Sequence, residues 1–129
     1  MANPVLTPSD GEHDGNFVGT SLRYSVGASG ALTGVNTRGV KSVTRNSAGS
    51  YTFKLNAPYP GGILYYAVNI IGAYTTAGGT VGVMTVDSSK SSTAPLFTIV
   101  FYAVGTQTAT EVDSGVSIVI RLGLKNGIV

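Results

Sequence analysis

The feature that most constrains the fold is an alternation of apolar and polar residues with a period of two, clearest between residues 38 and 60. Residues 51–55, YTFKL, alternate in this way, as expected for a strand with one buried face. Residues 40–45 before them show two distinct faces as well. Residues 57–62, APYPGG, end the second strand because proline offers no donor to a ladder. The stretch therefore predicts a β-hairpin.

The turn chemistry predicts the register of this hairpin. A three-residue loop, residues 47–49, needs a left-handed residue at its third position, and Gly49 provides it without a Cβ clash. A shift by one residue would set Lys41 opposite Lys54, which is unfavourable for like charges. The predicted pairs are Val43 with Phe53, Arg45 with Tyr51, and Lys41 with Leu55.

The remaining chain predicts an all-β fold. Turn signals recur at short intervals, and no helical periodicity is present. Segments 63–71 and 96–104 are apolar on both faces, as in strands covered on both sides. We expect an antiparallel β-sandwich, jelly-roll-like, with about eight strands; a closed barrel is the alternative. Besides the hairpin, strands are expected at 17–26, 35–37, 63–71, 80–86, 96–104 and 116–124, with loops at 27–34 and 105–115.

Length and composition predict a single domain with an arm. The 129 residues suit one domain. Residues 1–16 lack apolar periodicity and are expected to form an extended N-terminal arm, while residues 17–129 form the sandwich. The N-terminus lacks a basic region and a long apolar core, so we expect no signal peptide. The longest apolar run, 63–71, is far short of the roughly 20 residues that span a bilayer, and no membrane partner is expected.

The charges are few and unevenly distributed. Charged residues make up 11% of the chain, against about 25% in typical domains. Residues 1–22 hold three acids and no base, whereas residues 23–86 hold five bases and no acid. An acidic arm followed by a basic body would favour attraction between neighbouring copies.

The residues that carry most enzyme chemistry are scarce. The chain has no cysteine, and its one histidine, His13, lies in the expected arm, where nothing orients it. Residues 10–15, DGEHDG, mimic the start of a calcium loop, but Ser21 stands at the position of the bidentate glutamate. The acids outside the arm lie in polar loops, without apolar neighbours to raise their pKa. These acids are Asp87, Glu111 and Asp113. We therefore expect that the chain is not an enzyme, binds no cofactor, and has no catalytic or metal site.

The basic residues and tyrosines of the hairpin predict a docking surface. Five bases over 64 residues form no dense patch, and no nucleic-acid motif is present, so nucleic-acid binding is not favoured. Tyrosines can also bind sugars, but the absence of tryptophan weakens this hypothesis. A surface that contacts other proteins fits the low charge and the high Gly, Ser and Thr content. The candidate interface residues are Asp10, Glu12, Asp14, Lys41, Arg45, Tyr51 and Lys54.

Residues 34–69 resemble a segment of small virion proteins of tailed bacteriophages, in particular head decoration, or cement, proteins. The resemblance lies in GVKSVTR, then NSAGSYTFKL, then a PYP turn before an apolar strand. It covers roughly a quarter of the chain, and it supplies no individual contact residues.

The resemblance implies a mechanical role on the capsid. Such proteins bind the outside of the shell and bridge major capsid protein subunits. It implies a homotrimer, with a dimer as the second choice. The protein would be made in the host cytoplasm and located on the capsid exterior. A phage tail or fibre module and a carbohydrate-binding β-sandwich are the alternatives.

Overall fold

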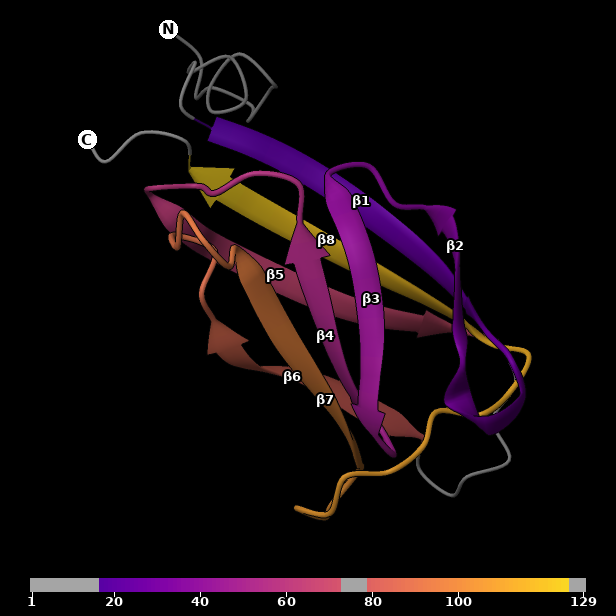
Figure 1. Cartoon of the computed structure of the whole chain (residues 1–129). Coiled ribbons are helices and arrows are strands. Elements are labelled where there is room, and N and C mark those ends of the chain that lie inside the picture. Colours follow the sequence, from indigo (N-terminus) through magenta and orange to yellow (C-terminus); the bar gives the residue numbers. More distant parts are fainter. Residues whose placement is uncertain (1–16, 73–78, 126–129) are drawn as a thin grey trace, which may run out of the picture.

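The computed structural model describes residues 17–72 and 79–125 (Figure 1). The expected arm, residues 1–16, lies outside the described residues. The described chain contains eight strands and one short 3-10 turn, η1 (Ala28–Gly30). No helix in this part of the chain is long and apolar enough to cross a membrane. The strands are β1 (Phe17–Val26), β2 (Leu32–Asn36), β3 (Val40–Ser47), β4 (Ser50–Leu55), β5 (Gly62–Ile71), β6 (Thr80–Asp87), β7 (Leu96–Ala103) and β8 (Ser117–Lys125).

The strands form two four-stranded antiparallel sheets that pack face to face (Figure 1). Sheet A has the order β2-β1-β8-β5, and sheet B has the order β3-β4-β7-β6. The predicted all-β sandwich of about eight strands is confirmed. Three hairpins, β1–β2, β3–β4 and β6–β7, stay within one sheet. The longest pairing joins β8 to both β1 and β5 in sheet A.

The core lies between the sheets, where alternate residues of each strand point inward. Tyr24 of sheet A meets Phe53 of sheet B with ring centroids 5.5 Å apart. Phe53 stacks in turn on Phe97 at 4.9 Å. The first contact joins the two sheets, and the second joins two neighbouring strands of sheet B. Each ring removes a large apolar area from water. The fully buried residues also include Leu22, Tyr51, Ile99, Phe101, Ile118, Ile120 and Leu122.

The central hairpin forms with most of the predicted register. Val43 lies opposite Phe53, and Arg45 lies opposite Tyr51, as predicted. The prediction for Lys41 is wrong: Val40 takes the place opposite Leu55, because the register shifts between Val40 and Ser42. The irregularity buries part of an apolar side chain against the core and leaves the lysine in solvent.

The turn of this hairpin is shorter than predicted. Ser47 pairs with Ser50, so only Ala48 and Gly49 lie between the strands, and a second register shift between Arg45 and Ser47 absorbs the extra residue. Gly49 does adopt the predicted left-handed conformation, with φ of 74°.

Three strand predictions were wrong in part. One is that β7 is covered on both faces, because its outward residues Val100 and Tyr102 are only half-buried. β2 begins at Leu32, within the segment expected to be a loop, because Leu32 pairs with Val26 and packs on the core. β5 was expected to be covered on both faces, but it is an edge strand of sheet A, with Leu64, Tyr65 and Ile71 exposed. The apolar residues on its outer side are therefore surface residues.

We predict that Gly49→Ala lowers the free energy of unfolding by more than about 2 kcal/mol. Its φ is unfavourable for alanine, and a Cβ at this position would lie 2.4 Å from the carbonyl oxygen of Thr110. Gly39→Ala is the matched control, because its φ of 87° is similar but no atom lies within 4 Å of its Cβ position. Urea unfolding should show a loss of about 1–2 kcal/mol for this variant. Equal losses in the two variants would contradict a steric requirement for glycine where residue 49 packs against Thr110.

Candidate protein-interaction surface

A polar cluster closes one end of the sandwich. Arg45 of β3 donates from Nε to Oε1 of Glu111 at 3.3 Å, and its Nη2 forms an ion pair with Oε2. The Tyr51 hydroxyl lies 2.6 Å from the carbonyl oxygen of Gly30 and 3.2 Å from Glu111 Oε1. Glu111 belongs to the loop between β7 and β8, so the cluster connects the β3–β4 hairpin to that loop and to η1.

The electrostatics of this cluster indicate a structural role. The hydrogen bond from Arg45 holds the pKa of Glu111 below its usual value. Burial, together with the nearby carboxylate, raises the pKa of Tyr51 to about 12. A general acid or base works best with a pKa near the working pH, and both of these groups are moved away from neutrality. The cluster therefore fixes the loop and does not resemble a proton-transfer site.

Two predicted contact residues belong to this cluster. Tyr51 is 0% exposed, so its assignment to an interface is corrected: alternation on β4 points it into the core. Arg45 keeps a side-chain exposure of 38%, but its guanidinium is paired with Glu111.

The other predicted residues do not gather into one patch. Lys41 is exposed at the irregularity in the edge strand β3, and Lys54 is exposed on the outer face of sheet B. Three further candidates lie outside the described residues, so the structure does not place them: Asp10, Glu12 and Asp14.

The outer face of sheet B carries an apolar strip that the sequence reasoning missed. In a sandwich, outward positions are usually polar. Here Val81 lies opposite Tyr102 and Val83 lies opposite Val100, all on the outer face. The exposed fractions of Val81, Val83 and Val86 are 49%, 38% and 42%. We define the apolar strip as Val81, Val83, Val86, Val100, Tyr102 and Val104.

Gly82 explains why the valines point outward. A Cβ at Gly82 would lie 2.8 Å from Cγ1 of Val68 and 2.9 Å from Cε1 of Phe101. The glycine therefore faces the crowded interior, and the alternation places Val81 and Val83 in solvent. The sequence contained this signal, because a glycine between two valines can mark a tight inward position.

The apolar strip ends at a polar half of the same face. The hydroxyls of Thr52 and Thr98 lie 3.0 Å apart, and the Asn46 amide donates to Thr52 at 2.8 Å. The outer face of sheet B is thus apolar toward β6 and hydroxyl-bearing toward β4, and β4 also carries the exposed base Lys54.

The edge of sheet B that is formed by β6 is protected from strand addition at one point. The backbone N–H of Met84 in β6 donates to the Tyr66 hydroxyl of β5 at 3.0 Å. This bond uses an edge donor, and β6 also has a register shift between Met84 and Val86. Both features discourage pairing with another strand, so contact with a partner is favoured through the face.

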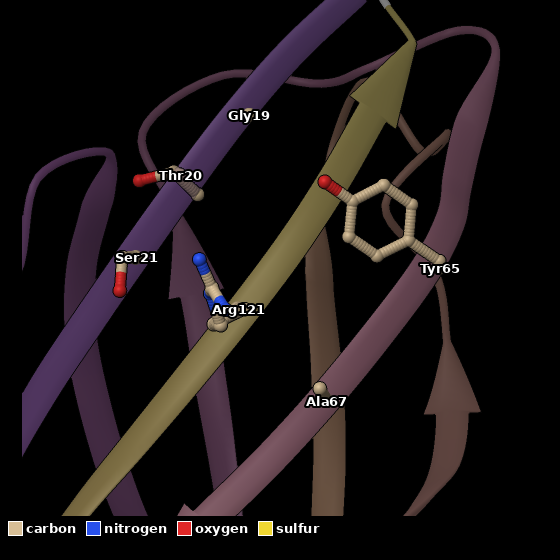
Figure 2. A pocket seen from close by; sticks show the side chains of 6 residues that line it. All are labelled: Gly19, Thr20, Ser21, Tyr65, Ala67 and Arg121. Carbon is tan, nitrogen blue, oxygen red and sulfur yellow. The ribbon is translucent and has the colours of Figure 1, made fainter. Parts of the chain in front are cut away.

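The outer face of sheet A has a shallow hollow of about 460 Å³ (Figure 2). Arg121 of β8 lies between Ser21 of β1 and Ala67 of β5, and these short side chains leave the guanidinium exposed. Figure 2 shows Tyr65 reaching from β5 across β8. Its ring covers Gly123, where an added Cβ would lie 2.0 Å from Tyr65 Cε2.

The described residues contain no group of three or more His, Cys, Asp or Glu side chains that could hold a metal ion. Comparison with family models, with curated protein sequences and with solved structures finds no match for this chain.

We predict that Tyr51→Phe lowers the free energy of unfolding by about 1–2 kcal/mol, because it removes a buried hydrogen bond to the Gly30 carbonyl. Tyr24→Phe is the matched control. Tyr24 is also buried, but its hydroxyl has no partner among the described residues. Urea unfolding should show no loss, or a small gain, for the control. A larger loss at Tyr24 than at Tyr51 would contradict the assigned role of the cluster.

A second prediction concerns acid pH. The pKa of Glu111 is lowered in the folded state, so its stabilising effect is present above the unfolded pKa of about 4.3. This effect is lost as the pH falls through the lower folded value. Glu111→Gln should therefore destabilise the protein at neutral pH and reduce the dependence of stability on pH below about 4.3. Urea unfolding at a series of pH values measures both effects, and an unchanged acid profile in the variant would argue against the ion pair.

Proposed function

We propose that this chain is a structural virion protein that binds the outer capsid surface of a tailed bacteriophage as a decoration, or cement, protein. It would stabilise the shell by bridging major capsid protein subunits. The observation that carries the proposal is the apolar strip, an uncharged surface on the outside of a β-sandwich. The resemblance of residues 34–69 to such virion proteins supports the choice of the major capsid protein as the partner.

The apolar strip suits a mechanical contact. Burying apolar area contributes about 25 cal/mol per Å², and exposed apolar patches on soluble proteins commonly mark interaction sites. Five of its six residues lie on two paired strands, β6 and β7, and Val104 directly follows β7. Because a paired sheet is rigid, a partner that covers both strands would be held without reordering of the backbone.

Repetition would multiply a modest contact. A standard interface buries about 800 Å² on each partner, and several linked contacts bind far more tightly than one. We propose a homotrimer, with a dimer as the next choice, because the three-fold positions of a shell offer three equivalent contact sites. Sedimentation velocity of the purified chain would report its oligomeric state. A strict monomer would contradict both the trimer and the dimer.

We predict that Val83→Lys weakens binding to isolated phage heads by about tenfold or more, because it places a charge in the contact. Val35→Lys is the matched control: Val35 is 64% exposed, more than Val83, but it lies on β2 at the far edge of sheet A. Co-sedimentation with heads of the virus that encodes the chain measures both affinities. Equal binding by the two variants would contradict a role for the strip.

The location on the particle can be tested directly. Gold-labelled antibodies against the chain should decorate the heads of intact virions evenly. Labelling confined to tails or fibres would overturn the decoration role in favour of the tail alternative.

A further inference from the structure

The outer face of sheet A is basic. Arg121 and Lys125 lie on β8 at outward positions four steps apart, and Arg23 lies on the neighbouring strand β1. None of the three acids in the described residues is on a strand of sheet A: Asp87 ends β6, and Glu111 and Asp113 lie in the loop before β8. The face therefore attracts a negatively charged partner.

The hollow leaves this charge accessible. The flanking residues on either side of Arg121 are Ser21 and Ala67, which are too short to cover it. The guanidinium is exposed, and the described residues contain no carboxylate within ion-pair distance of it. Figure 2 shows its side chain extending from β8 toward β1, with the Tyr65 ring on the β5 side of β8.

The N-terminal segment has the complementary charge at a matching spacing. Asp10, Glu12 and Asp14 alternate with Gly11 and His13 and have no Lys or Arg among them. In an extended backbone they would project from one side and span about 13 Å. The outward positions from Arg121 to Lys125 on β8 span the same four residues, again about 13 Å. The carboxylates at the two ends of this segment therefore match the spacing of Arg121 and Lys125. The middle one would lie over Gly123, and Arg23, which is opposite Val119, lies two positions beyond Arg121.

We propose that residues 10–14 of one copy bind the outer face of sheet A of a neighbouring copy, with the carboxylates of Asp10 and Asp14 on Arg121 and Lys125. Arg23 adds to the positive charge of the face. This inference rests on the proposed function, because copies held side by side on a shell would link in this way. The apolar strip lies on the opposite sheet, so the two contacts do not compete.

The geometry favours a second copy over the same chain. Asp14 is three residue steps from Phe17, where β1 begins beside Lys125, and three steps reach at most about 11 Å. A layer packed on a sheet lies about 10 Å above it. The connection would thus be fully extended in climbing off its own sheet, with no residue left to reverse direction. A neighbouring segment has no such restriction.

Paramagnetic NMR on the full chain tests this without phage heads. Because the chain has no cysteine, Ser9→Cys carries a nitroxide at a unique position beside Asp10. Chains that carry this nitroxide but no ¹⁵N are mixed with ¹⁵N-labelled wild-type chains at low salt. We expect concentration-dependent broadening of amides on β1, β8 and β5, and its loss in 1 M salt, where the screening length is about 3 Å.

Charge reversal identifies the site. Arg121→Glu in the ¹⁵N chain should weaken the contact by about tenfold or more. The matched control Lys54→Glu, on the outer face of sheet B, should leave it unchanged. Nitroxide chains with Asp10→Lys and Asp14→Lys should restore binding to a ¹⁵N chain that carries both Arg121→Glu and Lys125→Glu.

Three outcomes would overturn the proposal. These are no intermolecular broadening, broadening on sheet B, and broadening seen only when the nitroxide and ¹⁵N are in the same chain. Because no head is present, failure here is distinct from failure of the decoration role, which the head-binding experiments measure.

Discussion

The packing of Tyr24, Phe53 and Phe97 between the sheets is the contact on which the rest of the structure depends. Tyr24 comes from sheet A, and the two phenylalanines come from sheet B. No disulfide can join the sheets in a chain without cysteine. Because backbone pairing acts within each sheet, the burial of apolar side chains is the main force that holds the two layers together. Once these rings face inward, strand alternation determines which side chains of every paired strand face the solvent. The position of each surface follows from this one constraint.

The two outer faces that result are chemically different. Sheet B is uncharged over most of its outer face and carries the apolar strip, whereas sheet A carries Arg23, Arg121 and Lys125. A rigid body with two unlike faces can contact two unlike partners at once. This separation is the physical reason for proposing that one face meets the shell and the other meets an acidic segment of the next copy.

The Arg45–Glu111–Tyr51 cluster shows how charge can mislead at the level of sequence. Arg45 and Tyr51 were expected at an interface because bases and tyrosines are common there. The fold instead brings Glu111, 66 positions from Arg45, to the end of the hairpin. The long loop between β7 and β8 controls this encounter, and local periodicity contains no information about where a polar loop crosses the sandwich.

The sequence by itself determined the β class, the central hairpin, the pairing of Val43 with Phe53 and the left-handed Gly49, because these depend on period-two alternation and local turn chemistry. Only the tertiary structure decided that β5 is an edge strand, that Val40 replaces Lys41 opposite Leu55, and that the valines of β6 are exposed. An apolar residue of a strand is compatible with either face of a sheet. The order of the strands, set by contacts between distant segments, determines which face is covered.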